Sequence, residues 1–492
     1  MTPVAPPRRP EPENRWPQGL VGGKTVPEKL DKSADVRLTF SFFVILRRPL
    51  ATVILGGAGV KLKALNGFKD ILPGEVELWQ HVETTARGVF ARFDFSEIRL
   101  PVLESTELFA RSIGETTDIV EKEMYTFVDK KITMRPEATA SLLRAYIEHG
   151  LYVQRPVQRL FTIGPMFRHE RPQKGRLRQF HQMDVEVLGS HSPLVDAELM
   201  AMGSMLLQEL GLTVSLEINS LGCPQCRPGF RTELLNFLAE RMEHLCDDCK
   251  RRSGTNPLRV LDCKNPGCRH QVLTAPSILD HLCPDCADHF AAVREGMERL
   301  QVPYTLNRFM VRGLDYYTRT TFEFITTDLG AQAAVGAGGR YDGLIEQLGG
   351  PKDTPGIGFA LGMERLVLLL QQKQGAWQEE SNFPQLFIIA LGREAMQSCH
   401  QLAHALRRGD LRVAMDLEGR SLKSQMKQAD KSGAGWVLIV GDDELRDGQG
   451  VLRNMQTQEQ RQVALEADIL QGILKPPAKH LIAKDRSIVK ED

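Results

Sequence analysis

Long hydrophobic runs are missing from this sequence. No apolar stretch approaches the about 18 residues that suggest a membrane-spanning helix. The nearest candidate, residues 40–46, is followed by Arg47, Arg48 and Pro49, and no small-residue cleavage site for secretion comes after it. We therefore expect a cytoplasmic protein without a membrane partner.

An excess of charge of either sign is also missing. Lys+Arg and Asp+Glu both number 62 in 492 residues, and aromatic residues make up 7%. This balance neither requires nor excludes a nucleic-acid partner, because a local basic surface on a neutral protein can bind a polyanion. The length allows two or three domains, each with its own core.

Cysteine is almost absent outside one stretch, which contains eight of the nine cysteines. The isolated Cys399 is expected in the core of a helix. Three of the four pairs have the C-x2-C spacing of zinc knuckles. Disulfides are rare in the cytosol, so we favour structural zinc over disulfides. Four cysteines would form each of two zinc sites, without a part in catalysis. The pairs are Cys223 and Cys226, Cys246 and Cys249, Cys263 and Cys268, and Cys283 and Cys286.

The pattern along the chain predicts several parts. Residues 1–60 are rich in proline and charge at the start and are expected to be a poorly structured extension; natural translation beginning near Val60 is one hypothesis. Apolar residues at three- and four-residue steps from Trp79 to Phe93 predict an amphipathic helix. The following "SEIRLPVLE" predicts a strand in which Pro101 favours a sheet edge or an interface.

A polar segment at 371–384 is typical of a linker. It separates a first domain at 61–370, which includes a cysteine-rich insertion at about 220–290, from a second domain at 385–475. Short apolar runs there alternate with helical segments around 394–408 and 421–432, which predicts an α/β domain with a partly parallel sheet. Residues 476–492 are expected to be a tail.

Residues 161–189 predict two strands joined by a basic loop. On the second strand the period of two places Gln182, Asp184 and Glu186 on one face, opposite an apolar face for the core. The polar face could bind a cationic or hydrogen-bonding ligand. The alternative is a hairpin with one solvated face.

The loop between these strands carries a cluster of cations within eleven positions. Arginine side chains match phosphate oxygens in a bidentate way, so the loop could bind a triphosphate or a nucleic-acid backbone. Phe180, which follows it, could stack on a purine. The alternative is a mobile, soluble loop. The cations are Arg168, Arg171, Lys174, Arg176 and Arg178, and Glu170 lies among them.

A third pattern, at 356–370, predicts a glycine-rich strand that turns at Gly362 into a helix with Arg365 in its first turn. A helix N-terminus is partly positive, and an arginine there adds to a local anion site. The alternative is a buried strand–turn–helix whose arginine only contacts a neighbour.

Together these patterns resemble the three motifs of class II aminoacyl-tRNA synthetases. Four segments narrow the resemblance to the histidyl-tRNA synthetase family: "RPEATA" (135–140), "FRHERPQKGRLRQFHQ" (167–182), "VRGLDYYTRTTFEF" (311–324) and "AGGRYDGL" (337–344). The resemblance covers about residues 63–470. Ala138 stands where the family more often has glycine.

The resemblance implies an α+β catalytic domain with a mixed, mainly antiparallel sheet and a C-terminal α/β anticodon-binding domain. It also implies ATP-dependent attachment of L-histidine to tRNA(His) through a histidyl-adenylate, with release of AMP and pyrophosphate. ATP as substrate, Mg²⁺ and tRNA(His) are the implied ligands. The family as a whole does not need zinc, so a metal-free insertion remains open. The helix and strand around Pro101 resemble the family's dimer element, so we expect a homodimer.

The resemblance also assigns residues. Arg312 and Arg168 are implied as catalytic residues, near the α-phosphate and the histidine carboxylate. The implied histidine-binding residues are Glu137, Ala138, Thr139, Arg168, Gln182, Glu186, Arg312, Tyr316 and Tyr317, with Glu186 and Tyr317 on the imidazole. The implied ATP-binding residues are Arg168, Glu170, Phe180 and Arg365.

Contacts with the RNA are implied for the basic loop and for the second domain. Arg171, Gln173 and Arg178 are the candidates for the acceptor end. Lys423, Lys427 and Lys431 recur every four residues, so they share one helix face that could meet RNA phosphates, or could simply be solvated. Two other readings stay open: a regulatory paralogue that serves histidine biosynthesis, and a class II synthetase for proline or threonine.

Overall fold

The computed structural model describes residues 62–113, 119–312, 314, 316–329, 334–373 and 383–474. The predicted N-terminal extension, the tail and most of the predicted linker lie outside these residues. All the elements below belong to the unit Lys63–Asp492. Within the described ranges no helix is long and apolar enough to cross a membrane.

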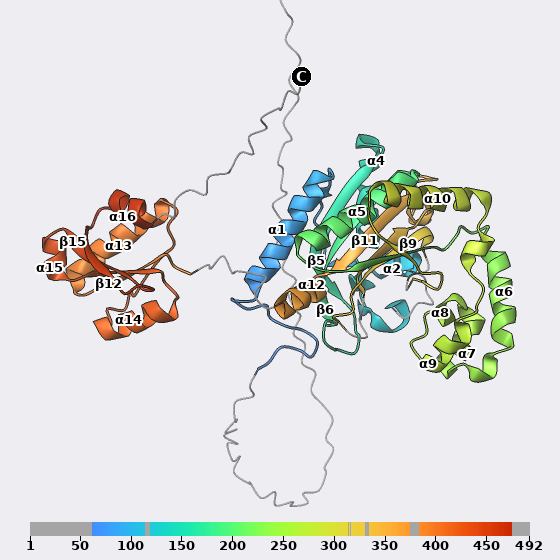
Figure 1. The fold of residues 1–492 in the computed structure, drawn as a ribbon, viewed down its shortest axis with the longest axis horizontal. Helices are drawn as coiled ribbons and strands as arrows, with labels where there is room; N and C mark the ends of the chain where they lie inside the picture. The colour runs from blue at the N-terminus through green and yellow to red at the C-terminus, as the bar shows by residue number, and fades with distance from the viewer. Residues whose placement is uncertain are drawn as a thin grey trace, which may run out of the picture. The chain divides into compact units, whose positions relative to one another are not determined.

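An eight-stranded sheet forms the centre of the first part of this unit (Figure 1). Its outer pairs β1·β5 and β7·β8 are parallel and the other pairs are antiparallel, so the sheet is mixed and mainly antiparallel, as predicted. In spatial order the strands are β1 (Ser96–Glu97), β5 (Gln158–Phe167), β6 (Gln179–Leu188), β11 (Gly356–Gly362), β10 (Ala334–Arg340), β9 (Thr318–Ile325), β7 (Ser215–Ser220) and β8 (Thr305–Leu306).

Four helices bury the apolar face of this sheet, because alternate strand residues such as Met183, Val185 and Val187 point toward them. Helix α1 contributes Trp79, Val82 and further predicted positions, and its amphipathic pattern is confirmed. The four helices are α1 (Val76–Arg92), α5 (Pro193–Glu209), α10 (Pro284–Arg299) and α12 (Met363–Gln372). Helix α12 extends into the predicted linker.

The single strand predicted for "SEIRLPVLE" is wrong. Glu97 pairs with Phe161 in the large sheet, whereas Leu103 pairs with Met134 in a separate three-stranded sheet. Pro101 lies between the two, where it has no N–H to offer a ladder. The Arg135 guanidinium instead binds the chain there, by donating to the carbonyl of Leu100 at 3.1 Å.

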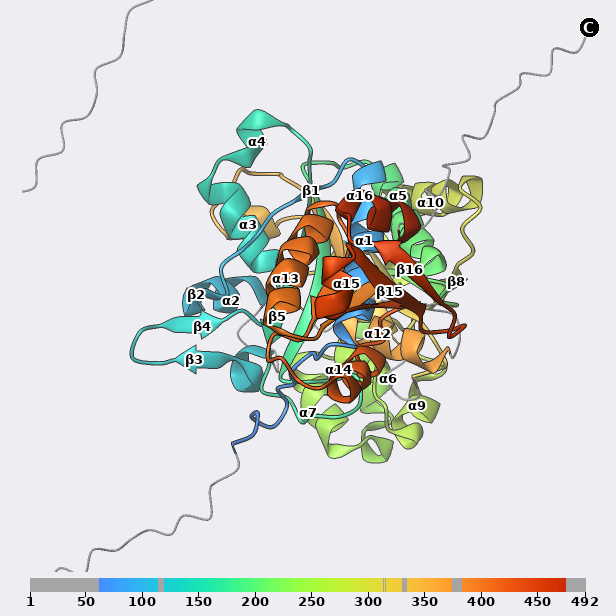
Figure 2. The ribbon, with the colours of Figure 1, turned by 90° about the vertical axis from the view of Figure 1, so that its left-hand side faces the viewer.

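The smaller sheet has the order β2–β4–β3, and its strands lie side by side in Figure 2. In the sequence, two helical segments lie between its strands β2 and β3, and three further helices come later. These elements are β2 (Leu103–Ser105), α2 (Thr106–Ile113), η1 (Ile119–Glu123), β3 (Tyr125–Phe127), β4 (Ile132–Met134), α3 (Thr139–Glu148), α4 (Leu151–Gln154) and α11 (Leu344–Gln347).

Short helices form a lobe between β7 and α10, visible beside the sheet in Figure 1. Its core is small and contains the eight clustered cysteines or packs against them. The lobe corresponds to the predicted cysteine-rich insertion. Its elements are α6 (Arg227–Ala239), η2 (Met242–His244), α7 (Asp247–Thr255), α8 (Leu258–Leu261), α9 (Pro266–Val272) and η3 (Ile278–His281).

Residues 383–474 form an α/β fold around a five-stranded sheet of order β13–β12–β14–β15–β16. The first three strands are parallel and the last two antiparallel, which confirms the predicted partly parallel sheet. Cys399 is buried in α13, as predicted. The elements are β12 (Leu386–Ala390), α13 (Arg393–Arg408), β13 (Val413–Met415), α14 (Leu422–Lys431), β14 (Trp436–Val440), α15 (Asp442–Arg446), β15 (Gln449–Asn454), β16 (Gln460–Ala464) and α16 (Ala467–Leu474).

Candidate active site

A cavity of about 500 Å³ opens on the polar face of the large sheet. Its floor is made by β6, β9, β10 and β11, and Gln182, Asp184 and Glu186 of β6 all line it. Asp184 and Glu186 are each 2% exposed. The alternative of a solvated hairpin face is therefore wrong, because the polar face of β6 is largely buried and lines a cavity.

One end of the cavity is acidic and begins at Glu137. This carboxylate accepts hydrogen bonds from the backbone N–H groups of Thr139 and Ala140, both at 2.9 Å. These are the first donors of α3, so the partly positive helix N-terminus stabilises the carboxylate. Ala138 is buried at the N-cap of the same helix. Burial nevertheless raises the pKa of Glu137.

Glu186 lies beside it and is held by two hydroxyl groups. Thr139 Oγ1 donates to Glu186 Oε1 at 2.7 Å, and the Tyr341 hydroxyl donates to Glu186 Oε2 at 2.5 Å. Burial raises the pKa of Glu186 to about 8, although both hydrogen bonds lower it. The close approach of β11 requires a glycine, because a Cβ at Gly358 would lie 1.6 Å from Glu186 Oε2.

The acidic end contains buried side-chain oxygens without a hydrogen-bond donor among the described residues. Among the described residues, Asp184 Oδ2 and Gln182 Oε1 are buried without a hydrogen bond. Burial, and then the charges of Glu186 and Glu137, raise the pKa of Asp184 well above its usual range. Three buried carboxyl groups that oppose each other's ionisation make a site for a cation or a multiple hydrogen-bond donor.

The other end of the cavity is basic. Arg168, at the end of β5, donates through Nε to the Pro136 carbonyl at 2.8 Å, and its guanidinium lies 5.2 Å from the centre of the Phe180 ring. Glu170 is buried and forms an ion pair with Arg176 of the loop. All four side chains line the cavity.

Arg365 completes the basic end from the first turn of α12, as predicted. Its guanidinium donates to the backbone carbonyls of Ala334 and Gly175. Burial lowers its pKa, and so do the positive charges of Arg176 and Arg168. Three mutually repelling cations define a site for a polyanion such as a triphosphate.

Arg312 and two tyrosines lie between these ends. Arg312 Nη1 binds Glu323 Oε1 at 2.5 Å, and its guanidinium lies 5.1 Å from the centre of the Tyr317 ring. Arg312 Nε is buried without a hydrogen bond among the described residues. The rings of Tyr316 and Tyr317 are 4.7 Å apart. Arg312 therefore has a donor that can still bind a ligand at the junction of the acidic and basic ends.

The three predicted acceptor-end residues do not share one orientation. Arg171 and Gln173 are exposed on the loop. Arg178 instead packs against Gly67 and donates to the Glu170 carbonyl at 3.1 Å, so it holds the loop against the preceding chain.

The structure thus brings all the predicted histidine and ATP residues to one cavity except Ala138, which lies beside it. It also adds residues that sequence reasoning missed. Tyr341 could have been found, because it lies inside the "AGGRYDGL" segment. Glu323 also lines the cavity and could have been found in the same way, because it lies inside the "VRGLDYYTRTTFEF" segment. Asp262 and Lys264 of the insertion line the cavity too, and no local pattern in the sequence indicates their part in it.

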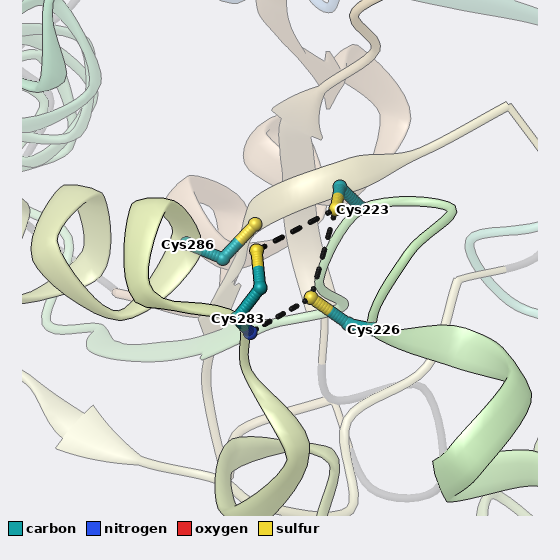
Figure 3. A group of neighbouring side chains, drawn as sticks. All are labelled: Cys223, Cys226, Cys283 and Cys286. Carbon is teal, nitrogen blue, oxygen red and sulfur yellow. Dashed lines mark hydrogen bonds between the residues drawn. The ribbon is translucent and has the colours of Figure 1, made fainter.

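The eight insertion cysteines form two groups in space. In each group four sulfur atoms lie within 4.8 Å of one another. The first group unites the outermost pairs in the sequence, and its four side chains converge in Figure 3. The outer group is Cys223, Cys226, Cys283 and Cys286, and the inner group is Cys246, Cys249, Cys263 and Cys268.

The spacing in these groups suits a metal ion. Zinc–sulfur bonds of about 2.3 Å in a tetrahedron place the sulfurs about 3.8 Å apart. The observed separations are 3.7 Å for Cys223–Cys226, 3.8 Å for Cys223–Cys283 and 3.9 Å for Cys246–Cys263. Disulfide sulfurs would be about 2.05 Å apart, and all these cysteines are free.

Known proteins share this architecture. A family model for histidyl-tRNA synthetase matches residues 67–225 and 260–366, and one for an anticodon-binding domain matches 385–470. A histidine–tRNA ligase from Desulfotalea psychrophila is 69% identical over 414 residues, covering 84% of this chain and 96% of its own. One from Geobacter metallireducens is 57% identical over 418 residues, covering 84% and 100%.

A solved structure agrees: apo histidyl-tRNA synthetase from S. aureus has 36% identity and a TM-score of 0.70, covering 84% of this chain and 99% of its own. The mixed sheet with its cavity and the second α/β fold are those of a class II aminoacyl-tRNA synthetase. Within that class, the chain belongs to the histidyl-tRNA synthetase family. This confirms the predicted family, fold class and enzyme class over the regulatory paralogue and over a synthetase for proline or threonine.

Proposed function

We propose that this chain attaches L-histidine to tRNA(His) at the cavity between Glu137 and Arg365, in two steps. The observation that carries the proposal is the junction of a buried acidic end with a basic end in one cavity. An amino acid presents cationic and donor groups, and ATP presents a polyanion, so the two substrates fit the two ends with their reacting groups at the junction.

Histidine occupies the acidic end. Its ammonium group binds Glu137, Thr139 and Gln182, and its imidazole binds Glu186, with Tyr316 and Tyr317 beside it. Tyr341 acts behind Glu186, because its hydroxyl holds that carboxylate in place. A pocket that pairs both ring nitrogens rejects side chains that lack them, since a competitor leaves buried polar groups unpaired at a cost of about 10⁴ in rate.

ATP occupies the basic end. Arg168 binds the α-phosphate and Arg365 the γ-phosphate, and Phe180 and Glu170 contact the adenine. The cation–π contact between Arg168 and Phe180 supports the adjacency of these two roles. The carboxylate of Glu323, which lines the cavity, would offer oxygen ligands to Mg²⁺, and the ion would neutralise part of the charge of the triphosphate.

The first step forms a bond between a histidine carboxylate oxygen and the α-phosphorus, and the bond to the β-phosphate breaks, releasing pyrophosphate. Arg312 and Arg168 stabilise the charge that develops at the phosphorus, which is an electrostatic contribution. In the second step the terminal ribose hydroxyl of the RNA attacks the carbonyl carbon and AMP leaves. Positioning supplies much of the rate, without a covalent enzyme intermediate.

The RNA binds both parts of the chain. Residues 61–370 are the catalytic domain, and residues 385–475 the anticodon-binding domain, where the exposed Lys423, Lys427 and Lys431 share one face of α14. The basic loop binds the acceptor end of the RNA. Its exposed residues Arg171 and Gln173 contact the acceptor end directly, and Arg178 holds the loop in its conformation. The protein works in the cytoplasm.

A homodimer forms through the element that contains Pro101 and the small sheet. Leu103 and Val128 of this region are 49% and 83% exposed, which is apolar surface that a second copy would cover. Light scattering of the purified protein tests this: a mass of one chain at micromolar concentration would contradict it.

The cysteine groups bind structural zinc. Each offers four thiolates with the sulfur spacing of a tetrahedral site. Backbone N–H groups also point at the sulfurs: Cys283 N donates to Cys226 Sγ at 3.2 Å, and Cys246 N donates to Cys268 Sγ at 3.1 Å. Elemental analysis of protein purified without chelator is expected to give about two zinc ions per chain, and none would contradict the proposal.

Histidine-dependent exchange between ATP and pyrophosphate tests the enzyme proposal, run separately with each of the twenty amino acids. Exchange with histidine alone is the expected result. A matched variant is Glu186→Gln, which keeps the volume but removes the negative charge and replaces one of the two acceptor oxygens with an NH2 donor. A folded protein that exchanges with no amino acid, or with another one, would refute the proposal.

A further inference from the structure

The 312–317 segment carries Arg312, Tyr316 and Tyr317, which line the active-site cavity. These three residues precede β9 and belong to no helix or strand. Side chains outside helices and strands need contacts from elsewhere to stay in place, because no ladder of backbone hydrogen bonds holds them.

Two arginines of the insertion supply such contacts, one at each end of the segment. Arg259 Nη1 donates to the Arg312 carbonyl at 3.2 Å. Arg227 Nη2 donates to the Tyr317 carbonyl, and its Nε donates to the Leu221 carbonyl at 3.5 Å. Both side chains are partly buried, so these charge-assisted bonds are shielded from water.

Each of these arginines lies close to a different cysteine group. Arg227 directly follows Cys226 and begins α6. Arg259 lies in the four-residue helix α8, whose end leads to Cys263, and Asn265 N–H donates back to Cys263 Sγ at 3.5 Å. A helix this short has little stability of its own, and its buried residues Val260 and Leu261 pack in the same small core as Cys263.

The outer group also connects to the catalytic sheet. Gly222, directly before Cys223, accepts a hydrogen bond from Arg319 N–H of β9 at 2.9 Å, and Leu221 N–H donates to the Arg319 carbonyl at 2.7 Å. A Cβ at Gly222 would lie 2.6 Å from Cys226 Cβ, and this glycine has φ +61°. The chain therefore passes from the sheet to the cysteines through a tight and well-defined turn.

We infer that Arg227 and Arg259 are positioning residues that hold the two ends of the 312–317 segment, and that the metal-binding cysteine groups keep both arginines in place. The insertion then contributes to histidine activation, beyond the purely structural part that its spacing suggested. This inference rests on the proposed function, because it uses the roles given to Arg312 and Tyr317. A displacement of about 1 Å at such groups can cost about 10²-fold in rate.

The test compares Arg227→Met and Arg259→Met with Arg251→Met. Methionine keeps an unbranched apolar stem and removes the guanidinium. Arg251 is a matched control, because it lies in the same insertion, is 65% exposed and pairs with Asp248 within α7. For each holoenzyme we would measure kcat and KM for histidine in the exchange reaction, the histidine dissociation constant by equilibrium dialysis, and the zinc content.

Each of the two variants is expected to lose about tenfold or more in kcat/KM for histidine, as removal of a charge-assisted hydrogen bond implies. Zinc content and the circular dichroism spectrum are expected to stay as in the unchanged protein, and Arg259→Lys is expected to recover part of the loss. The control is expected to behave like the unchanged protein. Kinetics of both arginine variants that match the control would overturn the inference.

The link to the metal is tested by whether the effects of zinc removal and of the arginine substitutions on histidine binding add up. Removal of zinc with a chelator is expected to weaken histidine binding in the unchanged protein, and much less so in the double variant Arg227→Met with Arg259→Met. Equal weakening in both would overturn the part assigned to the cysteine groups. Failure of the proposed function looks different, because the unchanged protein would then show no histidine-dependent exchange at all.

Discussion

Removal of the Tyr341 hydroxyl should change the pH at which histidine binds. In Tyr341→Phe the ring stays packed, and the 2.5 Å hydrogen bond to Glu186 Oε2 is lost. Burial raises the pKa of Glu186 to about 8, while the hydrogen bond from Tyr341 lowers it. Without the hydroxyl the pKa therefore rises further, and Glu186 stays protonated to a higher pH.

The size of the shift follows from the strength of the bond. A hydrogen bond to a charged group contributes about 1.5–3 kcal/mol, and one pH unit corresponds to about 1.4 kcal/mol. The carboxylate form, which accepts the imidazole N–H, should thus need a pH about one to two units higher. At neutral pH we expect kcat/KM for histidine to fall about 10- to 100-fold.

The assay is ATP–pyrophosphate exchange at limiting histidine across pH 6 to 10. Ionisation of histidine itself is the same in both proteins, so a difference between their profiles belongs to the enzyme. Tyr146→Phe is the matched control, since its hydroxyl is also buried but has no hydrogen-bond partner among the described residues. If the acidic limb of Tyr341→Phe coincides with that of the unchanged protein, the reasoning about Glu186 is refuted.

Three further outcomes are expected. Gly358→Ala should lower kcat/KM for histidine at least about 100-fold in the same assay, because the new Cβ would occupy the space of Glu186 Oε2. Arg340→Met should destabilise the protein by about 3–5 kcal/mol in urea denaturation, because it leaves the fully buried Asp196 without its ion-pair partner; an unchanged midpoint would contradict this. Replacing the three lysines of α14 with glutamine should raise KM for tRNA and flatten its salt dependence, yet leave pyrophosphate exchange unchanged. The lysines are Lys423, Lys427 and Lys431, and tRNA kinetics equal to those of the unchanged protein would contradict their role.

Much of the site could be predicted from the sequence, because its signals are local. The period of two along β6 places Gln182 and Glu186 on one face wherever that strand lies. Likewise, the glycine-rich strand and the following apolar helix place Arg365 in a first helical turn. Backbone geometry over a few residues decides such relations, so they need no knowledge of the rest of the fold.

Other relations depended on which surfaces pack together. Whether the polar face of β6 was solvated or buried depended on elements far away in the sequence, such as α3 and the strand that carries Gly358. The sequence around Pro101 predicted one strand, whereas its pairing with Phe161 on one side and Met134 on the other shows two strands in two sheets. The residue pattern of a strand does not indicate which other strand it pairs with.

The cysteines show most clearly which relations the sequence determines and which the tertiary structure decides. Their spacing indicated four pairs and two metal sites, which is a local property of the chain. The tertiary structure decided that the two outermost pairs form one group and the two inner pairs another. It also decided that Arg227 and Arg259, which lie near these groups in the sequence, contact the 312–317 segment. Spacing determines which residues can act as one ligand pair, whereas the packing of distant segments determines which pairs meet and what else they touch.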